Sequence, residues 1–493
     1  EQFSFSGSNS NIIFNETVTN DISTTNSLGL NGNTTLKKAL GTSSSKITSF
    51  TVTGTTQLSS DIITSVQQSF SEKLTISNAN AILDSPNFSF STIEINTYSL
   101  TIKSDGSNEI SSVISGSGNL IKSGTGTLTL SADNTYTGAT DVMSGTLIIS
   151  DNSPTKGTSG FNGPGDLIVE PSSTSFSSAF STSGWTFNNT LGGLTIGTAS
   201  NTSDITIGSN TEIAGPISVY GDDIVVSGSI SSTKSNSNIL LKAKGHIYTN
   251  ENHNFSTNGG DLIFWSNSNN TISGVENNEV DLRGNNNLTT SGGDIYLAGG
   301  LDNGNGRPAG YAYRGYDDTI RSADLGANVT LNSAGGNIFI RGQGGGVGLG
   351  FTGSGIEINS NGGIVSLDGI GNSNRGIWIG HNLDLNSNGG DIIMTGTSTS
   401  SYGIGFENSG ITIDSGTGSI TIVGQSNSNR GISVGDQLAI NSDSNSDTAI
   451  SIKGSSSSSL GVYFGSETAN KNILIQSTTT TDNKAEGGKR KRR

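Results

Sequence analysis

Three short motifs return in the same order about every 27 to 30 residues between Gly348 and the end of the chain. The first begins with two glycines and continues as an alternating apolar strand, at 335–340, 362–367, 389–394 and, weakened, 417–422. The second places an alternating apolar pair after a glycine, at Gly348, Gly376, Gly403, Gly431 and Gly461. The third alternates Ile and Leu, at 356–358, 383–385, 411–413 and 438–440. Alternation of this kind is typical of β-strands, and a repeat this short buries its apolar face only against its neighbours. The pattern therefore predicts an all-β, parallel β-solenoid (β-helix) with about three strands per coil.

The composition agrees with a folded solenoid. Only 30% of the residues are hydrophobic and 13% are charged, which in an irregular sequence would indicate disorder. Here the Ile, Leu, Val and Phe residues fall at regular alternating positions, so each strand presents one narrow apolar strip. The 70 glycines and the many asparagines suit corners where the backbone needs a positive φ.

Charge and cysteine content limit the possible partners of the chain and its cellular compartment. A net charge of −15 disfavours nucleic acid as a partner, because no basic surface is available to neutralise phosphates. The absence of cysteine favours export without disulfides. No apolar run reaches the roughly 18 residues of a membrane span. The chain starts at Glu1 with no signal sequence, and we expect a mature form or a fragment.

Residues 116–149 carry a second, more specific pattern. They read G-x-G-x-L-x-K-x-G-x-G-T-L-x-L, then N-x-Y-x-G-x-T, then G-T-L. This stretch closely resembles the autotransporter-associated β-strand repeat of bacterial passenger domains. We expect the leucines to point inward, and Lys122 and the threonines to face water; the leucines are Leu120, Leu128, Leu130 and Leu147.

From 259–264 and 292–297 onward, the Gly-Gly-led strands look like the repeats of haemagglutinin-like bacterial exoproteins. Those proteins are right-handed parallel β-helices, so the resemblance implies a right-handed coil here, as is usual for parallel crossovers. We therefore expect three regions. Residues 1–115 form a less regular, strand-rich section that is a cap or a separate domain, 116–476 the β-helix, and 477–493 a disordered tail. Within the first region, 61–74 reads as a short helix or as two strands.

The basic end of the tail has three open interpretations: a protease processing site, a contact with an anionic surface, or an appended sequence.

One insertion interrupts the repeat. Gly293 and Gly336 are 43 residues apart, against 27 for each of the next two steps, and the extra sequence lies within 301–318. Because solenoids often carry function on projecting loops, this aromatic and charged segment is a candidate binding site for a sugar or a protein. Its candidate residues are Arg307, Tyr311, Tyr313, Arg314, Tyr316 and Asp317. The alternative is a flap that folds over the coil and fills a groove.

Arg375 and Arg430 form a second candidate. Both stand in the context S-N-R-G-I, two repeats apart, with Tyr402 at the corresponding step between them. Stacked coils would align them in a row with a spacing of about 5 Å per coil. Such a row is either a glycan-binding stripe or a set of solvated arginines inherited with the repeat.

Sequence features that would indicate catalysis or metal binding are weak. In the pairs Asp222-Asp223 and Asp317-Asp318, neighbouring side chains point to opposite faces of a strand. The three histidines have no metal-binding spacing with one another. Asp294 and Asp391, which directly follow glycine pairs, are expected to cap their turns. We expect no metal, no cofactor and no enzymatic activity.

Together, the two resemblances imply an exported bacterial adhesin-like rod, extracellular or at the cell surface and associated with the outer membrane. It would display binding loops for a glycan or a protein on a target surface. One alternative is a self-assembling surface-layer or fibre subunit that packs against identical copies. Another is a carbohydrate-active β-helix enzyme, which would need clustered carboxylates in a groove.

Overall fold

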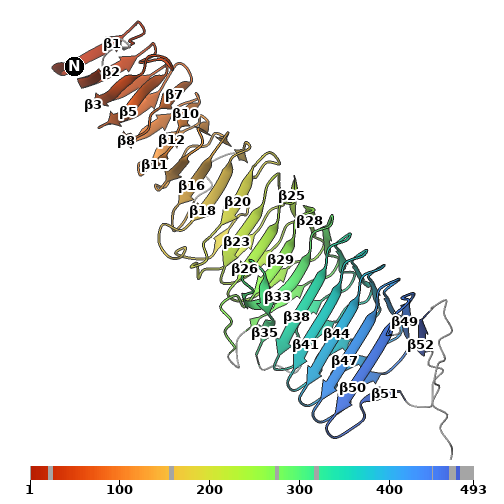
Figure 1. Ribbon diagram of the computed structural model, residues 1–493. Helices are drawn as coiled ribbons and strands as arrows, with labels where there is room; N and C mark the ends of the chain where they lie inside the picture. The colour runs from red at the N-terminus through yellow and green to blue at the C-terminus, as the bar shows by residue number, and fades with distance from the viewer. Residues whose placement is uncertain are drawn as a thin grey trace, which may run out of the picture. The chain divides into compact units, whose positions relative to one another are not determined.

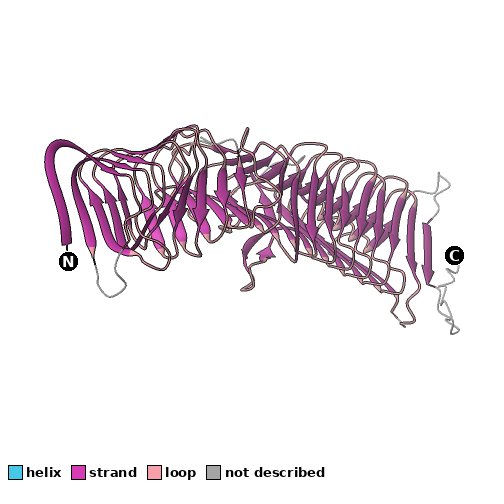
Figure 2. Ribbon diagram, turned by 90° about the horizontal axis from the view of Figure 1, so that it is seen from above, coloured by secondary structure: helices cyan, strands magenta, loops and turns pink. Residues whose placement is uncertain are grey.

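The computed structural model describes residues 2–19, 26–154, 160–272, 277–315, 321–446, 448–465 and 473–477. All regular elements in these ranges are β-strands, joined by turns and loops (Figures 1 and 2). No helix capable of crossing a lipid bilayer occurs in the ranges just given. The chain divides into two compact units, Glu1–Asp222 with Gly228–Lys234 (unit 1) and Asp223–Ser227 with Ser235–Arg493 (unit 2).

Unit 1 is built from parallel strands that stack coil upon coil. Its largest sheet runs, in pairing order, β12 (Ile114–Gly116), β9 (Ile93–Ile95), β6 (Leu74–Ile76), β4 (Thr56–Leu58), β2 (Ser27–Leu36), β3 (Ile47–Val52), β5 (Ile62–Phe70), β7 (Ala81–Asp84), β10 (Leu100–Lys103), β13 (Leu120–Ser123), β15 (Thr140–Val142) and β17 (Phe161–Asn162), with β1 (Gln2–Phe14) on β2 and β8 (Phe88–Phe90) on β5. A second row contains β11 (Ser107–Ile110), β14 (Thr127–Leu130), β16 (Thr146–Ser150), β18 (Asp166–Glu170), β20 (Gly193–Ile196) and β23 (Ile217–Gly221). Two shorter pairs are β19 (Phe180–Ser181) with β21 (Ile205–Ile207), and β22 (Thr211–Ile213) with β25 (Ile230–Ser235).

The strand ladders cross residue 115 without a break. Strand β10 pairs in parallel with β13, and β11 with β14, so the less regular N-terminal section stacks directly on the 116–149 repeat. The ambiguous stretch 61–74 forms strand β5 and the start of β6. Buried rings, including the Phe50–Phe70 pair with centroids 5.8 Å apart, pack in the interior of this section.

Lys122 corrects one expectation. Its side chain is fully buried, in the inward row between Ile102 and Val142, rather than facing water. The reason is strand geometry: residues two apart share a face, so a lysine two positions after the inward Leu120 also points inward. Its Nζ donates hydrogen bonds to the carbonyl oxygens of Ser123 (2.9 Å), Gly124 (2.8 Å) and Ser144 (3.0 Å), which links two coils. Burial lowers the pKa of this lysine.

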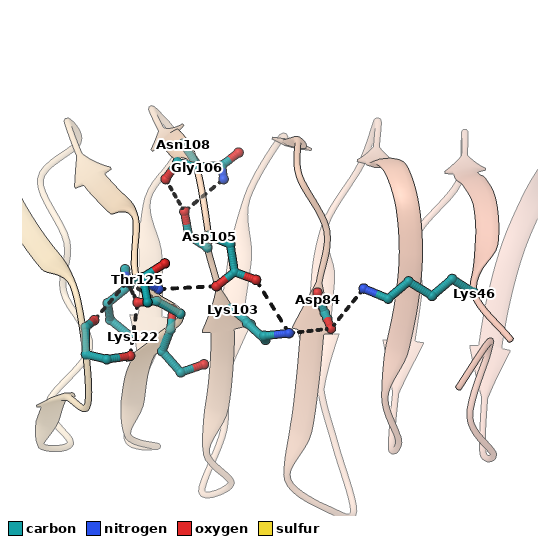
Figure 3. Close-up of polar contacts among 12 residues, drawn as sticks. Lys46, Asp84, Lys103, Asp105, Gly106, Asn108, Lys122 and Thr125 are labelled. Atoms are coloured by element: carbon teal, nitrogen blue, oxygen red, sulfur yellow. Dashed lines mark hydrogen bonds and ion pairs between the residues drawn. The ribbon is translucent and has the colours of Figure 1, made fainter. Parts of the chain in front are cut away.

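Figure 3 shows Lys122 beside a row of surface charges that also spans coils. Asp84 lies between Lys46 (3.5 Å) and Lys103 (3.0 Å), and Lys103 in turn lies 3.6 Å from Asp105. The carboxylate of Asp105 also accepts the backbone N–H of Thr125 at 3.2 Å. Asp84 is nearly buried but its two lysine partners are more than a third exposed, so we assign the row a structural role of modest strength.

Unit 2 has three parallel sheets, one for each motif of the repeat. Sheet I contains β26 (Ile239–Ala243), β29 (Leu262–Ser266), β33 (Ile295–Asp302), β38 (Ile338–Gly344), β41 (Val365–Gly371), β44 (Ile392–Ser398), β47 (Ile420–Ser426) and β50 (Ile450–Ser456). Sheet II contains β24 (Ile224–Val226), β27 (Ile247–Thr249), β31 (Val280–Leu282), β36 (Arg321–Leu325), β39 (Val347–Phe351), β42 (Ile377–Ile379), β45 (Ile404–Phe406), β48 (Ile432–Val434) and β51 (Val462–Phe464). Sheet III contains β28 (Asn254–Asn258), β32 (Asn287–Thr290), β37 (Thr330–Asn332), β40 (Ile356–Asn359), β43 (Leu383–Asn386), β46 (Ile411–Asp414), β49 (Leu438–Ser442) and β52 (Ile473–Ser477).

The registers of these sheets follow the repeat. Ile338 pairs with Val365, which pairs with Ile392, and Ile420 continues the same inward row of sheet I. The long strands of sheet I lie side by side in Figure 1. The predicted parallel β-solenoid with three strands per coil is thus confirmed; its right-handed sense stays a prediction.

The Gly-Gly corners have a steric cause. At Gly362 the backbone has φ of 113°, which strongly favours glycine. At the next residue, Gly363, an added Cβ would lie 1.9 Å from the carbonyl oxygen of Gly336 on the preceding coil. Asp294 and Asp391 do not cap their own turns as expected. Their side chains accept the backbone N–H of the equivalent residue on the next coil, Asn337 (2.7 Å) and Ser419 (2.8 Å) respectively.

Candidate functional site

The inserted loop begins with an exposed hairpin turn at 301–306, and from Arg307 to its last described residue, 315, it lies against the coil. Strand β34 (Pro308–Gly310) pairs antiparallel with β33, and β35 (Ala312–Arg314) pairs in parallel with β38 and antiparallel with β30 (Asn277–Asn278). Its polar side chains contact the solenoid: Arg307 forms an ion pair with Asp261, Arg314 with Glu279, and the Tyr311 hydroxyl donates to Asp368 at 2.7 Å.

Burial agrees with these contacts, since Tyr313 is only 7% exposed. This arrangement is that of a flap on the coil, with its charged groups already satisfied by the chain. Tyr316 and Asp317 lie outside the described residues, so their placement stays a prediction.

Arg375 and Arg430 lie in a different place, on the outer face of sheet II. Two backbone hydrogen bonds, Gly376 N–H to Tyr402 O at 3.1 Å and Gly403 N–H to Arg430 O at 3.2 Å, link the three consecutive coils. The structure therefore brings Arg375, Tyr402 and Arg430 into one row.

A second row runs beside the first, through the central residue of each strand in sheet II. Its members, in register, are Gly350, Trp378, Gly405, Ser433 and Tyr463. The neighbouring strand residues point into the core, so these five positions face outward.

The two rows interleave cations and rings. The guanidinium carbon of Arg321 lies 4.3 Å from the centroid of the Trp378 ring, and that of Arg375 lies 5.6 Å from the same ring. Arg375 and Arg430 lie on Tyr402 at 5.4 and 5.5 Å. Arg430 also covers Tyr463 at 3.5 Å. Each contact is within the range of a cation–π interaction, so the rings and guanidinium groups hold one another in place.

Glycine at two outward positions makes this interleaving sterically possible. A Cβ at Gly350 would lie 2.4 Å from Cγ of Arg321, and one at Gly405 would lie 3.2 Å from Cδ of Arg375. The aliphatic parts of both arginines therefore rest on bare backbone as they reach toward the aromatic rings.

The two central arginines differ in electrostatic environment. Arg375 forms an ion pair with Glu407, whose other oxygen accepts the indole N–H of Trp378 at 2.8 Å. Among the residues that the structure describes, the Arg430 side chain bonds neutral oxygens, the Tyr402 hydroxyl at 3.4 Å and Ser433 Oγ at 3.3 Å. Across the described ranges of the chain, no carboxylate lies within ion-pair distance of Arg430.

These side chains border an open groove with a volume of about 510 Å³. Its lining residues include Trp378, His381, Tyr402, Glu407, Arg430, Ser433 and Tyr463. A concave surface with aromatic rings and a few polar groups is typical of ligand sites. We refer to it below as the arginine–aromatic groove.

Half-buried carboxyl groups lie on or beside earlier strands of the same sheet. Asp281 and Asp324 are register partners on β31 and β36, and Asp324 lies 3.8 Å from Arg321. Burial raises the pKa of Asp324 to about 6, although the charge of Arg321 opposes that rise. Burial likewise raises the pKa of Glu279 and of Asp281, against the charges of Arg314 and Arg283 respectively. Glu279 thus pairs with Arg314 of the inserted loop, Asp324 lies beside Arg321, which covers Trp378, and Asp281 pairs with Arg283 outside the groove.

Within the described residues, no group of three or more His, Asp or Glu side chains is arranged to hold a metal ion. The sequence pattern indicates Arg375, Arg430 and Tyr402, but the candidates drawn from it did not include Trp378, Tyr463 and Glu407. A signal for Trp378 and Tyr463 is present in the sequence: each stands between the inward residues of the second motif, so each must face outward beside the arginine row. Glu407 follows its strand in a turn and has no comparable signal.

Residues 120–149 match the passenger-associated transport repeat. The match covers β13 to β16 and confirms the resemblance to the autotransporter-associated repeat. No curated protein and no solved structure matches the chain. The fold and this match define a parallel β-solenoid that carries a repeat of transported passenger domains.

Proposed function

We propose that this chain is the exported, surface-displayed β-solenoid of a bacterial adhesin, and that it binds glycans through the arginine–aromatic groove. The passenger-associated repeat supports export. Stacked strand ladders support a stiff carrier, because each coil is hydrogen-bonded to the next along the whole of each sheet.

The observation that carries the binding proposal is the composition of the groove. Tyr, Trp and Arg are the residue types that dominate the energetics of many interfaces. Their aromatic rings and guanidinium groups lie on one another and line the groove. Guanidinium N–H donors suit the hydroxyl and ring oxygens of a saccharide, and the coil spacing of about 4.8 Å repeats the arrangement along the sheet.

The test is binding of the purified chain to a glycan array. We expect the Trp378→Ala/Tyr463→Ala double variant to lose at least about ten-fold in affinity for the glycans that the wild type retains. Tyr248→Ala is the matched control, since Tyr248 faces outward on the same sheet beneath Arg283 (4.5 Å) but outside the groove. Equal losses in both variants, or no retained glycan at all, would contradict the proposal.

A self-assembling subunit is a second candidate, favoured by one observation. Apolar side chains are exposed on the last described coil: Leu460 is 54% exposed, Phe464 47% and Leu474 48%. Sedimentation velocity over a wide concentration range tests it. Growth of ordered oligomers, abolished by Phe464→Ser, supports this candidate, and a monomer at every concentration rejects it.

We propose no enzymatic activity. The three carboxyl groups that lie together on sheet II, Glu279, Asp281 and Asp324, each have an arginine partner within ion-pair distance. A general acid and base would need to reach a substrate instead.

A further inference from the structure

We infer that the arginine–aromatic groove selects acidic glycans, and that Arg430 binds the carboxylate of a uronate-type sugar. The inference rests on the proposed function and names the class of its ligand. It follows from the difference between the two arginines of the groove.

Arg375 is committed to the chain itself. Its Nε lies 2.8 Å from Oε1 of Glu407, and the same carboxylate accepts the N–H of Trp378. One carboxylate thus neutralises this arginine and fixes the tryptophan beside it. We assign Arg375 a positioning role in the groove.

Arg430 keeps its charge available. Among the described residues, its side chain makes two hydrogen bonds, both from Nη1, both long and both to neutral oxygens. A guanidinium carries five N–H donors in one plane, so most of them remain open to a ligand. The guanidinium carbon lies 3.5 Å from the centroid of the Tyr463 ring, which holds the group in place, and Arg430 lines the groove.

This geometry suits a carboxylate better than a hydroxyl. Two parallel N–H donors on the edge of a guanidinium match the two oxygens of a carboxylate, and such charge-assisted pairs are stronger than neutral hydrogen bonds. Stacking on an aromatic ring lowers the conformational freedom that Arg430 would otherwise lose on binding.

The net charge of the chain limits where an acidic glycan can bind. At −15, the molecule as a whole repels an acidic polymer. Attraction must therefore come from a local cation, and screening limits its range to about 10 Å at an ionic strength of 0.1 M. The arginines of the inserted loop are not available for this role, since Arg307 and Arg314 are paired with Asp261 and Glu279.

The groove also favours a polymer over a single sugar. Tyr402, Arg430 and Tyr463 come from three consecutive coils, so a saccharide chain that lies across the coils meets them in succession. We expect longer oligosaccharides to bind more tightly than the monosaccharide.

Titration calorimetry of the full chain with oligogalacturonate and with its methyl ester tests the inference. The two ligands share one backbone and differ in charge. We expect the free acid to bind at least about ten-fold more tightly than the ester, and Arg430→Gln to remove that preference. Arg283→Gln is the matched control, because Arg283 is half exposed and lies on Tyr248 outside the groove. Thermal unfolding verifies that both variants fold.

The outcomes separate the inference from the proposed function. Equal binding of acid and ester, or a preference that survives in Arg430→Gln, overturns the acidic selection but leaves glycan binding intact. Stronger binding of a sulfated dextran than of the galacturonate, lost in Arg430→Gln, overturns the carboxylate assignment in favour of sulfate. Failure to bind the acid, the ester or any array glycan rejects both proposals.

Discussion

Among single residues, buried and half-buried polar groups in both units make hydrogen bonds that reach from one coil to the next. Lys122 bonds a carbonyl oxygen of the following coil at Ser144, and the carboxylate of Asp294 accepts the N–H of Asn337. A buried polar group without a partner costs several kcal/mol, on the order of 2–7 by transfer estimates. These contacts therefore fix the alignment of coils as well as satisfying the groups.

Lys122 gives the first prediction. In Lys122→Met the carbonyl oxygens of Ser123, Gly124 and Ser144 lose their shared donor, and we expect unit 1 to lose about 2–4 kcal/mol of unfolding free energy. Hydrogen exchange of peptides from 120–149 at increasing urea measures the loss. Lys103→Met is the control, since Lys103 is 39% exposed in a surface ion pair and its removal costs at most about 1 kcal/mol. Equal effects of the two substitutions would contradict the structural role of Lys122.

Asp324 gives a prediction about pH. Its pKa in the folded chain is about 6, above the ordinary value of 3.8, so the folded state binds this proton more tightly than the unfolded state. The corresponding stability is fully present below about pH 4 and is lost as the pH rises through about 6. At about 1.4 kcal/mol per pKa unit, the loss is at most about 3 kcal/mol.

Asp324→Asn removes this titration. We expect the urea midpoint of unit 2 to fall less steeply between about pH 4 and pH 7 in the variant than in the wild type. Hydrogen exchange of peptides from 321–351 follows unit 2 alone. Parallel pH profiles for the two proteins would show that Asp324 does not contribute.

Among the elements, the corners of unit 2 repeat one buried arrangement. The hydroxyl of Ser360 donates to the carbonyl oxygen of Gly363 at 2.5 Å, and Ser387 makes the same contact with Gly390. Both serines are fully buried. The hydroxyl replaces the backbone partner that the sharp Gly-Gly turn removes, so it belongs to the turn as much as the glycines do.

Ser360→Ala isolates this contribution. It leaves the carbonyl oxygen of Gly363 without its donor, and we expect a loss of about 1–3 kcal/mol in the stability of the coil around it. Ser366→Ala, at an outward position of the same coil, is expected to change stability by less than about 0.5 kcal/mol. Hydrogen exchange of peptides spanning 356–394 compares the two, and similar values would contradict the role given to the buried hydroxyl.

Gly405 tests the construction of the groove. In Gly405→Val, a side chain would occupy the space over which Arg375 extends, and displacement of Arg375 would loosen Trp378 and Tyr402. We expect glycan affinity to fall by at least about ten-fold while the stability of the fold changes by less than about 1 kcal/mol. Thr421→Val, on the outer face of sheet I, is the control. Unchanged affinity in Gly405→Val would mean that the interleaved side chains are not the binding surface.

The regular elements were predictable because their cause is local. The period of the repeat places Ile338, Val365 and Ile392 in one row before any long-range contact is known. The expectation that Lys122 faces water is wrong because the alternation that places Leu120 inside applies equally two residues later, and strand geometry outweighs the preference of a charge for water.

At the scale of the whole chain, the two units carry different functional features. Unit 1 carries the passenger-associated repeat, and unit 2 carries the arginine–aromatic groove. The candidate site was predictable in part, since the shared context of Arg375 and Arg430 indicates a row. The position of the inserted loop on the coil was not predictable. Its contacts, such as Arg307 with Asp261, join residues 46 apart in the sequence, and no local pattern relates them.

The central claim is that the groove, and not the inserted loop, binds a glycan. Hydrogen–deuterium exchange of the full chain with and without oligogalacturonate tests it most directly. We predict slower exchange in 375–380, 402–408, 430–435 and 462–465, with 301–315 unchanged. Protection confined to 301–315, or no protection anywhere at saturating ligand, would contradict it.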